Sequence, residues 1–241
     1  RMVPIADGTD LGGSLRNPAN FNNVVGFRPS PGRVPNNSPL AWSGLSVQGP
    51  MARTVGDVAL FLSAIAGPDN RSPMSIEQPG LMFAVPLERN FSNVRIAYVP
   101  DLGGLPVDPR VASRIESSVS VLESLGCIVE QTTPDFVNAD EVFKTLRAWG
   151  TASARGSLLK EHRNLIKSTI VREIEEGLKL TAMDVSLAEE MRTTYYHRVR
   201  TFMDTYEFMI MPVNQVPPFD VTMEYPTEIN GVLMNTYIDW M

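Results

Sequence analysis

The clearest periodic pattern of apolar positions lies in the middle of the chain. A mostly apolar run at 94–99 predicts a strand. Asp108 and Pro109 then supply a cap and a first-turn proline, and apolar residues recur at helical spacing up to Gly126, which predicts a helix. A second strand is expected at 127–130. Because a strand, a helix and a strand with short links form a βαβ unit, we expect the two strands to pair in parallel with the helix packed on them.

The same periodicities predict elements on either side of this unit. Thr54 has the form of a helix N-cap, because Asp57 occupies the third position after it, and Gly67-Pro68 ends that helix. Further helices are expected at 138–163 and 182–205, further strands at 3–6, 24–28 and 207–211, and irregular segments at 30–50 and 68–93. This alternation of strands and helices predicts an α/β protein.

Composition and charge narrow the classes of partner. With 241 residues, 43% of them hydrophobic, the chain is long enough for one large domain or two small ones. The net charge of −6 is spread without a basic run, which makes nucleic acids and anionic membrane surfaces poor partners. No apolar run approaches the roughly 20 residues of a membrane span.

Cysteine and histidine usage bears on redox and metal chemistry. Cys127 is the only cysteine, so an internal disulfide is excluded and a reducing, cytoplasmic location is expected. Its place at a predicted strand start favours a buried structural thiol. His162 and His197 lie among charged residues of predicted helices, which favours surface positions. Without a second cysteine or a His/Asp cluster, we expect no metal site and no cofactor.

One stretch carries candidate chemistry, namely 10–19 with the sequence DLGGSLRNPA. Glycines lack a Cβ, so a Gly-Gly turn brings backbone N–H groups close to a ligand oxygen. If these groups converge in front of Ser14, one loop supplies both an attacking oxygen and an oxyanion hole. Asp10 and Arg16 flank the turn with opposite charges that could clamp it. Pro18 is expected to stop any helix or strand from continuing.

Other interpretations of this stretch remain open on the residues alone. A Gly-Gly-Ser sequence is also an ordinary turn, and Gly-rich loops can hold phosphate. The stretch has neither the spacing of a P-loop nor that of a dinucleotide fingerprint. It is not the elbow of an α/β-hydrolase either, because Arg16 stands where the second glycine belongs. The residues thus suggest a serine nucleophile without indicating its base.

The stretch resembles the nucleophile half of the signature of the amidase signature family of serine hydrolases. The resemblance continues through the motifs VGFRP at 25–29 with GRV at 32–34, GPMARTVGD at 49–57 and AGPD at 66–69. These motifs follow one another in the family's order over the first seventy residues, and 94–136 fits more loosely. The resemblance implies a single α/β domain over 1–241, with helices packed on both sides of a mixed β-sheet.

The resemblance also implies roles for the loop. Ser14 matches the nucleophile, and the other positions match the backbone oxyanion hole (Leu11, Gly12, Gly13 and the Ser14 amide) and residues that support it (Thr9, Asp10, Arg16). In the family the base is a lysine acting through a second serine at a cis peptide, both N-terminal to this motif. Neither segment is present here, so the chain is interpreted as an internal fragment that also lacks C-terminal sheet.

The expected activity is hydrolysis of a small-molecule amide to a carboxylate through an acyl-serine intermediate, in the full-length enzyme. The fragment alone is expected to be inactive. The alternatives are the amide-hydrolysing subunit of a tRNA-dependent amidotransferase and a non-catalytic homologue. Homo-oligomerisation is left open, and Trp42 either anchors the loop at 30–50 or lines an acyl pocket.

Overall fold

The structure is a computed structural model that describes residues 3–241. The chain divides into two compact units. The first consists of the chain up to Asn90 together with Pro106–Val111 and Val213–Met241, and the second consists of Phe91–Leu105 and Ala112–Pro212. The expectation of a single domain stays a prediction.

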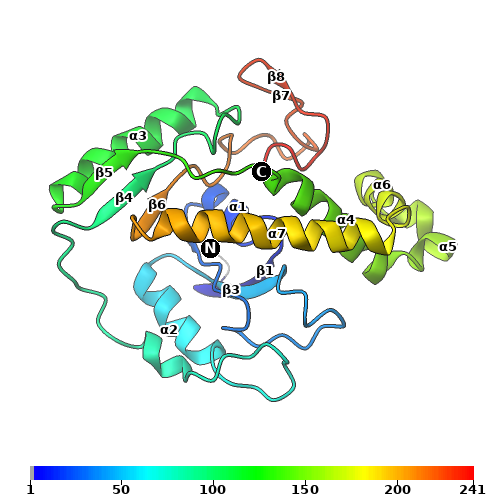
Figure 1. Cartoon of the computed structure of the whole chain (residues 1–241), viewed down its shortest axis with the longest axis horizontal. Helices are drawn as coiled ribbons and strands as arrows, with labels where there is room; N and C mark the ends of the chain where they lie inside the picture. Colours follow the sequence, from blue (N-terminus) through cyan, green and yellow to red (C-terminus); the bar gives the residue numbers. More distant parts are fainter. Residues whose placement is uncertain (1–2) are drawn as a thin grey trace. The chain divides into compact units, whose positions relative to one another are not determined.

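The first unit is built on a three-stranded antiparallel sheet (Figure 1). Its central strand is β3 (Val47–Ala52), which pairs on one side with β1 (Ile5–Asp10) and on the other with β2 (Val25–Gly26). Helix α1 (Arg16–Phe21) follows β1. Helix α2 (Val55–Ile65) follows β3, and a short 3-10 helix spans Gly80–Phe83.

Helix α2 confirms its predicted start. The Thr54 hydroxyl accepts a hydrogen bond from the Asp57 backbone N–H at 3.1 Å. Val58 and Leu62, which lie four positions apart on one face of the helix, are buried. A local cap and a one-sided apolar stripe are sufficient to define this helix from the sequence.

Two elements of the first unit differ from the expectation. Pro18 does not prevent a helix but lies in the first turn of α1, where its missing N–H would have no intrahelical partner anyway. β3 extends through Gly49-Pro50, within the segment expected to be irregular. Pro50 is tolerated here because the sheet uses its carbonyl group and not its nitrogen. The Pro50 carbonyl oxygen accepts a hydrogen bond from the N–H of Phe27, which directly follows β2, at 3.0 Å.

The second unit contains the predicted βαβ arrangement. β4 (Arg95–Tyr98), α3 (Pro109–Ser124, its first three residues counted with the first unit) and β5 (Ile128–Gln131) follow one another, and β4 pairs in parallel with β5. β6 (Phe208–Ile210) pairs in parallel with the other edge of β4. Cys127 is buried beside Val94 and Ile96, as expected for a structural thiol.

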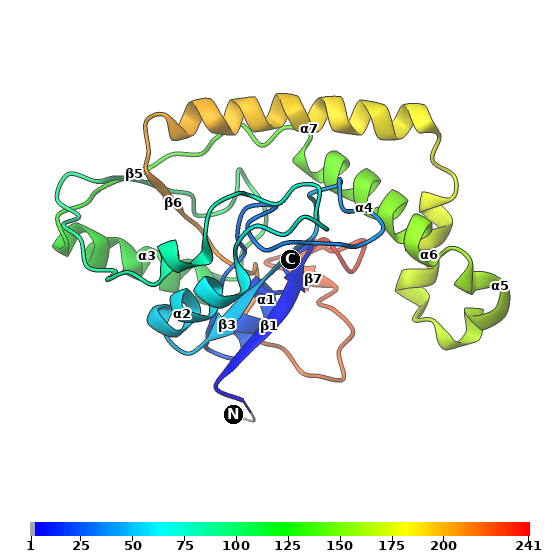
Figure 2. The ribbon, with the colours of Figure 1, turned by 90° about the horizontal axis from the view of Figure 1, so that it is seen from below.

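Helices form the rest of the second unit (Figure 2). They are α4 (Ala139–Arg155), α5 (Leu158–His162), a 3-10 turn at Arg163–Leu165, α6 (Ser168–Gly177) and α7 (Ala182–Met203). The helix predicted at 138–163 is therefore interrupted near Gly156, and α6 is an additional helix. α4 packs against both α6 and α7.

The α4–α6 contact is close and contains a buried charge pair. A methyl group added at Gly177 would lie 2.1 Å from the Ala148 carbonyl oxygen, so the two helices touch through backbone. Beside this contact Arg147 Nε lies 2.8 Å from Glu173 Oε1, and the Thr151 hydroxyl donates to the same oxygen at 2.8 Å.

The first unit also contains a small hairpin of β7 (Glu228–Ile229) and β8 (Val232–Leu233). Ile229 belongs to a cluster with Val216 and Met234, and Phe219 and Trp240 pack on that cluster. The α/β class is thus confirmed, with the described strands in three separate sheets.

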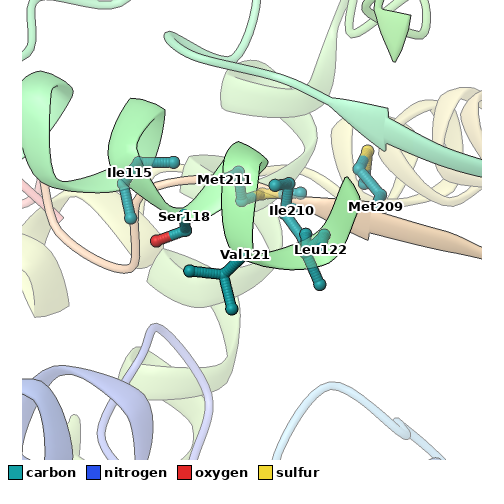
Figure 3. A pocket seen from close by; sticks show the side chains of 7 residues that line it. All are labelled: Ile115, Ser118, Val121, Leu122, Met209, Ile210 and Met211. Carbon is teal, nitrogen blue, oxygen red and sulfur yellow. The ribbon is translucent and has the colours of Figure 1, made fainter. Parts of the chain in front are cut away.

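An apolar groove of about 520 Å³ lies in the second unit, between one face of α3 and the end of β6 (Figure 3). Its lining residues are Ile115, Ser118, Val121, Leu122, Met209, Ile210 and Met211. Within residues 3–241, no helix is both long enough and apolar enough to cross a membrane.

Candidate active site

Asp10, the last residue of β1, organises the glycine turn. Its side chain is fully buried, and its carboxylate accepts the backbone N–H of Gly13 at 2.9 Å and that of Leu15 at 3.2 Å. Arg16 Nε and Nη2 each donate to the same carboxylate at 2.9 Å, a two-point contact with both oxygens. The predicted clamp between Asp10 and Arg16 is therefore present.

Arg28 adds a second cation to this arrangement. Its Nη1 donates to the Asp10 carbonyl oxygen and lies 3.2 Å from Asp10 Oδ1, while its Nη2 donates to the Leu45 carbonyl at 2.9 Å. Arg28 thus joins the end of β1 to the loop that precedes β3. This residue lies in the VGFRP motif, yet no role for it was expected from the sequence.

These contacts fix the charge of Asp10. Burial alone would raise the pKa of the carboxyl, but the hydrogen bond from Arg16, the Gly13 amide and the charges of Arg16 and Arg28 together lower it to about 2. Asp10 is consequently a carboxylate at neutral pH. All its bonds hold the loop, which suits a structural anchor rather than a proton acceptor.

Ser14 lies between Gly13 and Leu15, whose amides both donate to Asp10. Its side chain is exposed, whereas Gly13 before it and Leu15 after it are buried. The turn places Gly13 at φ +104°, and a methyl group there would meet Asn17 Oδ1 at 2.5 Å. Only glycine fits this position without strain. Ser14 is thereby held outward on a turn fixed at both ends.

The backbone N–H groups of the turn divide into two sets. The Gly13 amide is engaged by Asp10. Within residues 3–241, no hydrogen bond from the amide of Leu11, Gly12 or Ser14 to another residue is seen. Thr9 lies on β1 opposite Gln48 and is exposed.

Lysine and histidine are absent from the sequence of the unit that contains Ser14. All four lysines and both histidines belong to the second unit. His162 and His197 are both exposed on their helices, as expected. Trp42 is 78% exposed, so it does not anchor its loop. Among the described residues, no group of three or more His, Cys, Asp or Glu side chains is placed to hold a metal ion.

Comparison with known proteins identifies the family of this fold. A model of the amidase family matches residues 1–241. An acylamidase of Rhodococcus erythropolis is 30% identical over 244 residues, which covers 100% of this chain and 51% of the relative. A glutamyl-tRNA(Gln) amidotransferase subunit of Pseudomonas entomophila is 39% identical over 132 residues, which is 54% of this chain and 27% of the relative.

A solved structure agrees over nearly the whole chain. A bacterial aryl acylamidase of the amidase signature enzymes superposes with a TM-score of 0.89 at 27% identity, covering 99% of this chain and 52% of that chain. The chain thus spans about half the length of the relatives that it matches. The chain belongs to the amidase family.

Proposed function

We propose that this chain is the nucleophile-bearing part of an enzyme that hydrolyses carboxamides through an acyl-serine intermediate. The observation that carries the proposal is the exposed Ser14 on a turn whose flanking amides are fixed by the buried Asp10 carboxylate. Such a turn presents a hydroxyl and free backbone donors together, which is what acyl transfer requires.

The proposed reaction has two steps. Ser14 Oγ bonds to the amide carbon, the resulting tetrahedral oxyanion accepts hydrogen bonds from the free turn amides, and the C–N bond then breaks. The serine proton ends on the departing nitrogen, so ammonia or an amine leaves. Water then adds to the acyl ester and releases the carboxylate and Ser14.

The general base is proposed to come from outside the unit that holds Ser14, because that unit has no lysine or histidine. The resemblance to amidase signature enzymes points to a lysine and a relay serine in a preceding segment. The chain's coverage of about half of its relatives supports a longer parent enzyme. On this proposal residues 1–241 alone do not hydrolyse amides.

Two relatives suggest different substrates. The relative that matches the whole chain is named an acylamidase, whereas the amidotransferase relative is more identical but matches 54% of the chain. We therefore propose acyl amides, including aryl acyl amides, as substrates, and glutamine as the second candidate. A cytoplasmic location is proposed from the single cysteine alone.

The test is the Ser14→Ala variant of the full-length enzyme, assayed with a chromogenic anilide and with a fluorophosphonate probe. We expect loss of hydrolysis by about 10³-fold or more and loss of labelling. Ser30→Ala, another exposed serine of the same unit, is the matched control and should leave both unchanged. Retention of a tenth of the activity in Ser14→Ala would show that another residue attacks.

Two further measurements separate the alternatives. Turnover of glutamine in preference to the anilide, dependent on a partner protein, would favour the role of the amidotransferase relative. Rapid labelling of Ser14 in the isolated 241-residue chain would place a base within it and would refute the external lysine.

A further inference from the structure

Leu15, directly after Ser14, occupies a slot that three glycines leave open. Its side chain is completely buried, in contrast to the exposed Ser14. Gly8 on β1 and Gly49 on β3 are cross-strand partners, so they lie side by side on the sheet. A methyl group added at Gly8 would lie 3.0 Å from Leu15 Cδ2, and one at Gly49 would lie 2.9 Å from Leu15 Cδ1.

The third glycine receives the backbone behind Leu15. A methyl group at Gly26 on β2 would lie 2.6 Å from the Leu15 carbonyl oxygen and 2.6 Å from Ala19 Cβ of α1. All three strands of the first sheet therefore omit a side chain where Leu15 and the start of α1 approach. Close-packed interiors transmit small displacements, so the slot defines where Leu15 can sit.

We propose that Leu15 is a positioning residue, and that its seating in the slot of Gly8, Gly26 and Gly49 sets the position of the Ser14 hydroxyl. This inference rests on the proposed role of Ser14 as nucleophile. Leu15 is held twice, by its side chain in the slot and by its N–H on Asp10. Ser14 is one peptide bond away and must follow any shift of Leu15.

The effect of such a shift falls on the reaction rather than on substrate binding. Misplacing a reacting group by about 1 Å can cost about 10²-fold in rate, and a crowded slot moves Leu15 by a fraction of that. We therefore expect a lower kcat with a nearly constant KM, because the attacking geometry matters mainly in the transition state.

The chosen variant of the full-length enzyme is Gly8→Ala. Its new methyl group meets two mobile side-chain ends, Leu15 Cδ2 at 3.0 Å and Met51 Cε at 3.5 Å, so the fold can accommodate it. Gly49→Ala is avoided, because its methyl group would meet the Phe27 carbonyl oxygen at 2.2 Å. Gly56→Ala is the matched control, since its nearest neighbour lies at 3.9 Å.

We expect Gly8→Ala to lower kcat and the rate of fluorophosphonate labelling about tenfold, with KM within about threefold of the parent. Gly56→Ala should change neither quantity. Valine lacks the two Cδ atoms with which Leu15 enters the slot, so Leu15→Val should relieve the crowding caused by Gly8→Ala. The double variant should therefore react with the probe faster than Gly8→Ala alone. The two changes should thus be strongly non-additive.

Two results would overturn the inference. One is a Gly8→Ala enzyme with unchanged kcat and a lowered melting temperature, since the slot would then serve stability alone. The other is a slow Gly8→Ala enzyme that Leu15→Val does not rescue. If Gly8→Ala fails to fold, Leu15→Val alone decides: we expect a reduced kcat, and an unchanged kcat refutes the inference. Failure of the proposed function appears separately, as activity retained by Ser14→Ala.

Discussion

Asp10 is the residue on which the loop depends most. A buried carboxylate is stable only when its oxygens are bonded, and here the side chains of two arginines and three backbone amides supply the bonds. Removing the charge of Asp10 leaves Arg16 and Arg28 without the carboxylate that both of them contact. The cost should therefore exceed that of an exposed ion pair.

The first prediction is that Asp10→Asn lowers the free energy of unfolding by about 2 to 4 kcal/mol at neutral pH. The folded pKa of Asp10 is lowered to about 2. Its stabilisation is thus present above the unfolded pKa and is lost as the pH falls through the folded value. Urea unfolding of both proteins should show a constant difference above about pH 5 that shrinks between about pH 4 and pH 2. A difference that grows toward acid would contradict this.

The second prediction separates two demands on Gly13. Gly13→Ala introduces a methyl group both at φ +104° and against Asn17. Gly104 is the matched control, because it has φ +110° and nothing within 4 Å of an added methyl group. Both substitutions should destabilise by about 1 to 3 kcal/mol through backbone strain, but only Gly13→Ala should slow probe labelling of Ser14. Equal labelling rates in the two variants would show that the conformation at Gly13 does not control the reactivity of Ser14.

At this scale the sequence predicts the site only where the contacts are local. Opposite charges six positions apart around a Gly-Gly turn indicate the Asp10–Arg16 clamp. Arg28 donates to the backbone carbonyls of Asp10 and Leu45. Every residue has such a carbonyl, so the sequence does not indicate which ones Arg28 binds. The Leu15 slot depends on glycines from three strands that come together only after folding.

Among the elements, local signals and tertiary contacts account for the successes and failures. The helix start at Thr54 is predictable because the Thr54 side chain accepts a hydrogen bond from the backbone N–H of Asp57, three residues later. The β7–β8 hairpin was not expected, although its turn pair Asn230-Gly231, with φ 48° and 82°, is typical of a two-residue hairpin loop. β3 is not predictable locally, because it forms by pairing with β1 and β2.

The third prediction concerns the crossing of α4 and α6. Gly177→Ala would push a methyl group into the Ala148 carbonyl at 2.1 Å and force the helices apart, which should destabilise the chain by about 1 to 3 kcal/mol. Gly150→Ala, on α4 with nothing within 4 Å, should instead stabilise by about 0.5 to 1 kcal/mol through helix propensity. Thermal unfolding of the two variants should therefore shift in opposite directions, and a shared direction would refute the close contact.

At the scale of the whole molecule, the first unit brings together segments that lie far apart in the sequence. The chain passes between the units after Asn90, Leu105, Val111 and Pro212. Residues from Val213 onward return to the first unit, where Asn214 accepts a hydrogen bond from Asn20 of α1 at 2.8 Å. Phe21, Phe219 and Trp240 join them as a cluster of three rings. No local pattern in the sequence indicates such a return.

The fourth prediction tests this return. Trp240→Ala removes ring contacts to Phe21 at 6.0 Å and Phe219 at 5.3 Å, so we expect a loss of about 2 to 4 kcal/mol in unfolding free energy. Trp42→Ala is the matched control, because Trp42 is 78% exposed and should change stability by no more than about 0.5 kcal/mol. Similar effects of the two substitutions in urea unfolding would contradict the clustered rings.

The pairing of Asn20 with Asn214 spans 194 residues, and this separation has a consequence for synthesis. A ribosome adds about 5 to 20 residues per second, so Asn20 emerges roughly 10 to 40 seconds before its partner. During that interval β1, β3 and the Asp10 anchor can already assemble, while α1 lacks Asn214 and Trp240. The contacts of α1, the helix that follows Ser14, are therefore completed late in synthesis. A nascent chain contains the glycine turn well before it contains the C-terminal residues that pack against α1.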